Sequence, residues 1–117
     1  MKYLALIYGD EGAWDALSEE ERQQMYERYR AFSAENEGKI VGGAETAPTR
    51  TATTVRVRGG ETIVTDGPFE TLDEPLGGFF VFDCESMDEA VELATRIPGA
   101  VTGAVEVWPA YVEETAS

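Results

Sequence analysis

The feature that most limits the possible folds is a β-hairpin whose register can be worked out from the sequence alone. Two runs rich in threonine and valine, residues 53–58 and residues 61–65, flank the pair Gly59-Gly60. Adjacent glycines between two β-forming runs predict a hairpin with a two-residue turn. That turn pairs Arg58 with Glu61 and, at the far end of the ladder, Thr53 with Asp66.

This register decides which side chains of the hairpin share a face. Directly paired residues lie on the same face, so Asp66 falls on the face of Val55 and Val57. Arg56 and Arg58 occupy the opposite face. A direct ion pair between Asp66 and Arg56 is therefore not expected.

Two helices and four further strands are predicted around the hairpin. Capping boxes at Ser18–Glu21 and Ser86–Glu89 begin the helices. The first helix should cover residues 19–35, and apolar stripes at helical spacing mark both helices: Met25, Tyr29 and Phe32 in the first, then Met87, Ala90, Val91, Ala94 and Ile97 in the second. The predicted strands are residues 2–8, 39–44, 79–83 and 103–109. In the second of these, Gly42-Gly43 predicts a bulge or a close backbone approach.

The order β-α-β, hairpin, β-α-β predicts an α+β fold. Without the hairpin the order is βαββαβ, the ferredoxin-like arrangement with two helices on one face of an antiparallel sheet. Residues 2–8 are apolar on both faces, as in a strand buried from two sides. The helices cover one face, and a partner subunit is the simplest cover for the other. We expect one domain over residues 1–112 and a flexible tail at residues 113–117.

Composition excludes several functional classes. The chain has 117 residues, 23 acidic and 9 basic, for a net charge of −14. This charge opposes binding to nucleic acid or to anionic membranes. No histidine is present and Cys84 is the single cysteine, so we expect no metal site and no intramolecular disulfide. The glycine pairs have the wrong spacing for a phosphate-binding motif, and we expect no bound cofactor. Without a signal-peptide layout or a membrane span, the expected location is the cytoplasm.

The segment Asp66-Gly67-Pro68-Phe69 carries the strongest turn signal, and Asp66 is the candidate catalytic residue. Gly67 and Pro68 together force a corner after the hairpin. A buried Asp66 with few donors would act as an acid or base near neutral pH. The alternative is that its carboxylate only braces the corner.

Four other residues are candidate ligand contacts. Glu106 and Tyr8 lie on predicted strands and would bring a carboxylate and a phenol to a cavity; the alternatives are an exposed edge glutamate and a buried structural tyrosine. Arg56 would bind an anionic ligand, or it solubilises an exposed strand. Phe69, in the corner motif, is the fourth candidate.

Six blocks of sequence, in order, resemble the YCII-related superfamily and, within it, the group named for its Asp-Gly-Pro-Phe motif. The blocks include the opening Met1-Lys2-Tyr3, the corner at residues 66–69, the strand opening Leu76-Gly77-Gly78-Phe79, and the final Val105-Glu106-Val107. The resemblance covers nearly the whole chain. The chain departs from the family in having no histidine, and in having Asp73 where a lysine is usual.

The resemblance implies a homodimer in which two ferredoxin-like domains pair face to face as a dimeric α/β barrel with a small-molecule cleft. It implies two further possibilities. One is a cofactor-free, lyase-like or isomerase-like enzyme using Asp66. The other is an accessory protein to an extracytoplasmic-function sigma factor, because genes of this bacterial group often lie beside such factors.

Overall fold

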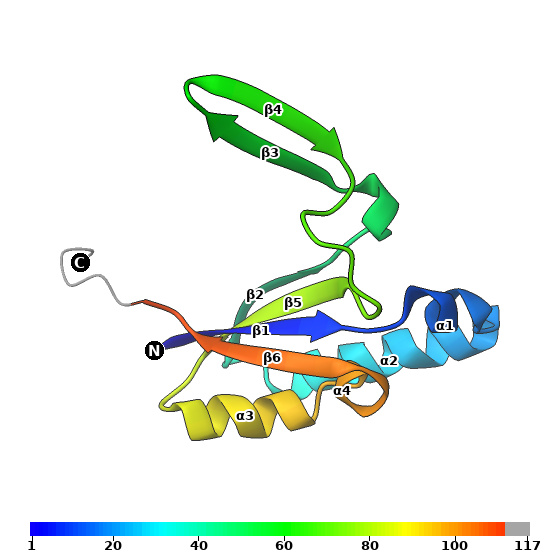
Figure 1. Cartoon of the computed structure of the whole chain (residues 1–117). Coiled ribbons are helices and arrows are strands. Elements are labelled where there is room, and N and C mark those ends of the chain that lie inside the picture. The colour runs from blue at the N-terminus through cyan, green and yellow to red at the C-terminus, as the bar shows by residue number, and fades with distance from the viewer. Residues whose placement is uncertain (112–117) are drawn as a thin grey trace.

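A computed structural model describes residues 1–111 of the chain, and its secondary structure alternates strands with helices (Figure 1). The strands are β1 (Lys2–Tyr8), β2 (Ile40–Glu45), β3 (Thr53–Arg58), β4 (Glu61–Asp66), β5 (Leu76–Asp83) and β6 (Ala104–Pro109). The helices are α1 (Glu11–Ala16), α2 (Glu19–Glu35), the 3-10 turn η1 (Thr49–Thr51), α3 (Met87–Thr95) and α4 (Gly99–Thr102). The tail predicted at residues 113–117 lies outside the described residues.

Four of the strands form one antiparallel sheet in the order β2-β5-β1-β6. The helices lie on one face of this sheet, and β3 and β4 form a separate hairpin on the side of the other face (Figure 1). The predicted α+β fold, with an antiparallel sheet and an inserted hairpin, is confirmed. The insert leaves and returns at one point, where the Thr46 amide donates to the Gly77 carbonyl at 3.1 Å.

The predicted capping box at Ser18–Glu21 is confirmed, whereas the one at Ser86–Glu89 is only half formed, because the Glu89 carboxylate accepts from the Glu85 amide instead. The Glu21 amide donates to Ser18 Oγ at 3.1 Å and the Ser18 amide donates to Glu21 Oε1 at 2.9 Å, so α2 begins at residue 19. In α3, the Ser86 hydroxyl accepts from the Glu89 amide at 3.2 Å. The helix α1 was not predicted, because the sequence Gly9-Asp10-Glu11-Gly12 indicates only the end of a strand. In the structure the Asp10 carboxylate caps α1 by accepting from the Gly12 and Ala13 amides.

The core lies between the sheet and the helices. Phe82, Leu93 and Ile97 are its largest fully buried side chains. Phe32 of α2 is buried against Phe80 and Phe82, with ring centroids 5.4 and 6.3 Å away. The stripe predicted on the second helix is wrong in part: Met87 and Val91 are 36% and 46% exposed, whereas Leu93 is buried.

The boundaries of three predicted strands shift by one to three residues. The second strand is Ile40–Glu45, the third strand of the sheet begins at Leu76, and the last begins at Ala104. The bulge predicted at Gly42-Gly43 is confirmed by a register shift between Ile40 and Gly42. The shift lets β2 continue past the glycines and extend to Glu45.

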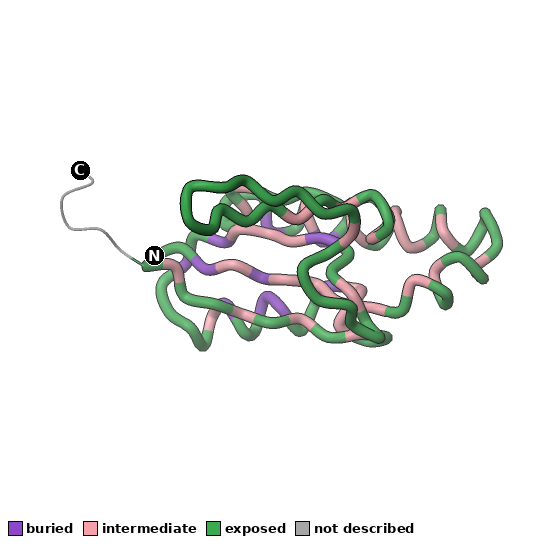
Figure 2. Tube along the Cα trace, turned by 45° about the horizontal axis from the view of Figure 1, so that its top comes forward, coloured by how far each residue is buried: buried purple, intermediate pink, exposed green. Residues whose placement is uncertain are grey.

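The hairpin register agrees at every pair with the one derived from the sequence. Thr53 lies opposite Asp66 and Arg58 lies opposite Glu61. Gly59 and Gly60 have φ of 59° and 79°, which is the left-handed region that a tight two-residue turn requires. The hairpin is exposed along almost all its length (Figure 2).

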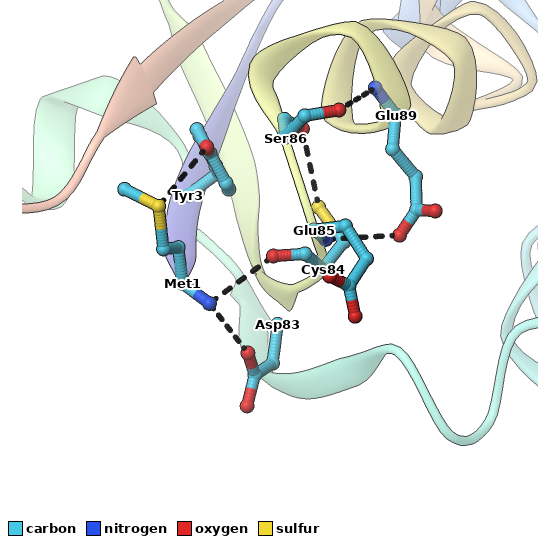
Figure 3. A network of polar contacts seen from close by, with 7 residues as sticks. All are labelled: Met1, Tyr3, Asp83, Cys84, Glu85, Ser86 and Glu89. Atoms are coloured by element: carbon cyan, nitrogen blue, oxygen red, sulfur yellow. Dashed lines mark hydrogen bonds and ion pairs between the residues drawn. The ribbon is translucent and has the colours of Figure 1, made fainter.

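A polar network joins the start of β1 to the end of β5 (Figure 3). The Met1 ammonium donates to Asp83 Oδ1 at 3.2 Å and to the Cys84 carbonyl at 3.1 Å. Cys84 is buried, and this burial is the main reason that the pKa of its thiol is raised. The thiol is therefore protonated near neutral pH and acts as a small apolar group.

No helix within residues 1–111 has both the length and the apolar character needed to cross a membrane.

Gly43 lies so close to the neighbouring strand that a side chain there would collide with it. A Cβ at this position would lie 2.6 Å from the Phe79 carbonyl oxygen, whereas one at Gly42 would meet only Val81 at 3.5 Å. Gly43→Ala should therefore lower the free energy of unfolding by about 1–3 kcal/mol. Gly42→Ala is the matched control and should be tolerated. Urea unfolding monitored by circular dichroism measures both, and equal losses in the two variants would contradict the assignment of β2 to β5.

Candidate functional site

The face of the sheet that the helices do not cover is mostly apolar. We call it the open face. The central strands contribute half-buried side chains to it, and β6 contributes exposed ones: Leu4, Leu6, Tyr8, Phe79, Val81, Glu106 and Trp108. Trp108 is 52% exposed. An apolar surface of this kind is unusual on a soluble monomer and marks a binding or association surface.

Three side chains on β1 and β6 form a polar cluster on the open face. The Tyr8 hydroxyl donates to Glu106 Oε1 at 3.4 Å, and the Trp108 indole Nε1 donates to the same oxygen at 2.7 Å. The antiparallel register produces this arrangement because it places Leu6 opposite Glu106 and Tyr8 opposite Ala104. Glu106 is thus held between a phenol and an indole.

The cluster has a defined electrostatic character. The pKa of Tyr8 is raised, first by partial burial of the phenol and then by the neighbouring Glu106 charge and its hydrogen bond. Tyr8 is therefore a neutral hydrogen-bond donor at physiological pH. Within residues 1–111 no group donates to Glu106 Oε2, so this oxygen can accept a hydrogen bond from a ligand.

Arg56 and Phe69 form a second pair, at the hairpin. The guanidinium carbon of Arg56 lies 4.7 Å from the centroid of the Phe69 ring, a cation–π contact. Phe69 is still 66% exposed. The two residues cover part of the arginine face of the hairpin, on which Ile63 also lies.

Asp66 lies apart from both pairs, at the exposed end of β4. Gly67 has a φ of 100° and its amide donates to the Ala52 carbonyl at 2.7 Å. Thr54 Oγ1 donates to the Gly67 carbonyl at 2.9 Å. Backbone groups and Thr54 therefore hold the corner, and among the hydrogen bonds of residues 1–111 none is accepted by the Asp66 carboxylate.

The structure thus brings Tyr8 together with Glu106, and Arg56 together with Phe69. Trp108 was not predicted as a site residue. The signal that would have found it is strand alternation, which places Trp108 on the same face as Glu106 and two residues along. The contact itself depends on rotamers that the sequence does not specify.

Shallow grooves also exist on the helical side of the molecule. One, of about 350 Å³, is lined by residues that include Met25, Phe32 and Pro98. Another, of about 370 Å³, lies between α3 and β6 and includes Val91 and Val107. Both are open, and neither is lined by Tyr8 or Glu106. Within residues 1–111, no group of histidine, cysteine and carboxylate side chains is arranged to hold a metal ion.

Comparison with known proteins identifies the family. The sequence model of the YCII-related domain matches residues 1–112. The chain belongs to the YCII-related family. It is also similar to an uncharacterized protein of Rhizobium meliloti (strain 1021), at 40% identity over 113 residues, which cover 93% of this chain and 91% of the relative.

A solved structure shares the fold at low sequence identity. It is 5-chloro-2-hydroxyhydroquinone dehydrochlorinase (TftG) from Burkholderia phenoliruptrix AC1100, in complex with 2,5-dihydroxybenzoquinone. The match has a TM-score of 0.59 at 19% identity and covers 97% of each chain. It supports the α+β fold of this family member.

The coupling of Tyr8 to Glu106 can be measured by titration. Glu106→Gln removes the charge that helps to raise the pKa of Tyr8, so this pKa should fall toward its ordinary value of 10.0 while staying above it, because burial of the phenol remains. Carbon-13 NMR of labelled tyrosine rings measures the shift, with Tyr8→Phe to assign the signal.

The sign for stability follows from the raised pKa. The contribution of Tyr8 to the free energy of unfolding is fully present below its pKa in the unfolded chain, and it is lost as pH rises through its pKa in the folded chain.

An unchanged Tyr8 titration in Glu106→Gln would contradict the coupling.

Proposed function

We propose that the protein is a homodimer, paired through its open face as a dimeric α/β barrel, with a small-molecule-binding cleft at Tyr8 and Glu106. The observation that carries the proposal is a hydrogen-bonded polar cluster set in an otherwise apolar, uncovered sheet face. Pockets for small molecules combine apolar walls with a few oriented polar groups in this way.

The amount of exposed surface supports a partner subunit. The chain exposes 8294 Å². A compact monomer of its 12.8 kDa mass would expose about 6,300 Å². The radius of gyration is likewise 16.3 Å, against about 13 Å for a compact chain of this length. The difference is in the direction expected for a chain that leaves surface for a partner, which buries ~800 Å² of each protomer in a standard stable interface.

A second copy is the occupant that this surface fits best. The net charge of −14 repels nucleic acid and anionic membranes, so the cover for the open face is a protein. A copy related by a twofold axis presents the same apolar residues, so each open face buries the other.

Light scattering tests the dimer. The wild-type chain should have twice its 12.8 kDa mass at micromolar concentration. Leu6→Lys places a charge in the centre of the open face and should shift the mass to that of a monomer, because a buried unpaired charge costs several kcal/mol. Val101→Lys is the matched control, since Val101 is 85% exposed and belongs to α4, which lies on the helical side of the sheet (Figure 1). A wild-type monomer, or a dimer in both variants, would contradict the pairing.

The ligand that suits the cluster is a hydroxylated aromatic or quinone-sized molecule. Glu106 Oε2 offers an acceptor, the neighbouring phenol offers a polar edge, and the Trp108 ring and apolar strands offer flat surfaces. The complex of the structural neighbour with 2,5-dihydroxybenzoquinone supports this ligand class as a starting point.

Tryptophan fluorescence tests ligand binding. In a Trp14→Phe background, Trp108 is the remaining tryptophan and reports on the cluster. Titration with 2,5-dihydroxybenzoquinone, catechol and hydroquinone should give saturable quenching for at least one probe. Glu106→Gln should weaken that binding about tenfold, as expected for loss of a charge-assisted hydrogen bond worth ~1.5 kcal/mol. Quenching that never saturates, or that Glu106→Gln leaves unchanged, would contradict a site at this cluster.

A cofactor-free lyase or isomerase is the second candidate function. The observation that favours it is that Tyr8 and Glu106 are an acid and a base already joined by a hydrogen bond. Asp66 stays a prediction for this alternative, although it is exposed and lies apart from that pair. Product formation seen by proton NMR in the same titrations, and lost in Tyr8→Phe or Glu106→Gln, would support the function, and loss in Asp66→Asn would add Asp66 to the site. Association with a sigma factor also stays a prediction from the family resemblance.

A further inference from the structure

One face of the β3–β4 hairpin is left uncovered by residues 1–111. The hairpin is a separate two-stranded sheet and does not hydrogen-bond to the four-stranded one. An isolated two-stranded hairpin is only marginally stable in water. It usually gains stability by packing an apolar face against another surface.

The base of the hairpin is nevertheless held firmly. The Gly67 amide bonds to the Ala52 carbonyl across the base. The turn η1, just before β3, is anchored to α1 because the Thr49 amide and hydroxyl both donate to the Glu11 carboxylate, the amide at 3.0 Å. These bonds make the hairpin an arm that projects in a defined direction (Figure 1).

The two faces of this arm differ. The arginine face is partly covered by Phe69, which contacts Arg56. The other, which we call the valine face, carries Val55, Val57 and Val64, which are 61%, 59% and 62% exposed. Val55 lies directly opposite Val64 in the ladder, so the valines form one continuous apolar strip.

The direction of the arm points to its partner. The arm lies on the same side of the sheet as the open face, opposite the helices (Figure 1). A second copy seated on the open face would therefore lie beside the arm. The arm and the open face are thus both on the side where that copy would sit.

We propose that the valine face of the β3–β4 arm docks on a second copy of this chain, so that each protomer of the dimer grips the other with its arm. This proposal rests on the dimer proposed above and assigns the arm a role in it. It accounts for an apolar strip that the chain does not bury itself. It also accounts for the firm base, because a preorganised arm loses less conformational entropy when it docks.

Site-specific photo-crosslinking on neighbouring residues of β4 tests the arm. Val64 lies on the valine face and Ile63 on the arginine face, and both are apolar, exposed and one residue apart. Val64→p-benzoylphenylalanine should give a covalent dimer on irradiation. Ile63→p-benzoylphenylalanine is the matched control and should give at least fivefold less.

The outcomes separate this proposal from the dimer itself. A dimer by light scattering with no covalent product from Val64, or with equal yields from Val64 and Ile63, overturns the role of the arm and leaves the paired sheets intact. A covalent dimer from Val64, found together with a Leu6→Lys variant that is still a dimer, supports docking of the arm. The same result overturns pairing through the open face.

A second variant measures the strength of the contact. Val55→Thr combined with Val64→Thr keeps the shape and β propensity of the hairpin but makes the strip polar. The dimer dissociation constant from analytical ultracentrifugation should rise at least tenfold. Circular dichroism checks that the strand content is kept, and an unchanged dissociation constant would overturn the proposal.

Discussion

The rest of the structure depends on a sheet that is buried from one side only. On the helical side, Phe32 packs against Phe80 and Phe82 and the helices complete a close-packed core. On the other side the same strands carry leucine, valine, tyrosine and tryptophan, and within residues 1–111 no helix lies over them (Figure 1). Strand periodicity makes this unavoidable, since a strand that is apolar at every position must be covered twice. The single chain supplies one cover, and the polar cluster lies on the face that lacks the other.

Local chemistry was enough to predict most of the fold. The capping box at Ser18 and Glu21 placed the start of α2 to the residue, and Gly59-Gly60 determined every pair of the hairpin ladder. These signals are strong because the interactions that they specify are confined to a few neighbouring residues. Where tertiary packing decides, the sequence was weaker: it placed Met87 and Val91 in the core stripe, although α3 turns Leu93 inward instead.

The candidate site, too, has parts that local sequence signals predict and parts that depend on tertiary packing. Alternation along β1 and β6 put Tyr8 and Glu106 on strands, and the structure joins them through a register that pairs residues nearly a hundred positions apart. Sequence alone could not supply that register, because antiparallel pairing between distant strands depends on the whole sheet. The position of Asp66 is the reverse case. The face of the hairpin on which Asp66 lies was predicted correctly. The turn that follows Asp66, however, is held by hydrogen bonds of Gly67 and Thr54 rather than by the Asp66 carboxylate.

The insert between β2 and β5 has a consequence for how the family can vary. Its two ends meet at Thr46 and Gly77, and the next residues inward, Glu45 and Gly78, are already paired in the sheet. β2 and β5 can therefore pair regardless of the segment between Thr46 and Gly77. The entropic cost of closing that segment grows only with the logarithm of its length. A chain can lengthen, shorten or replace the segment without altering the order of the four strands. Sequence changes can thus accumulate in the insert while the sheet that carries Tyr8 and Glu106 stays the same.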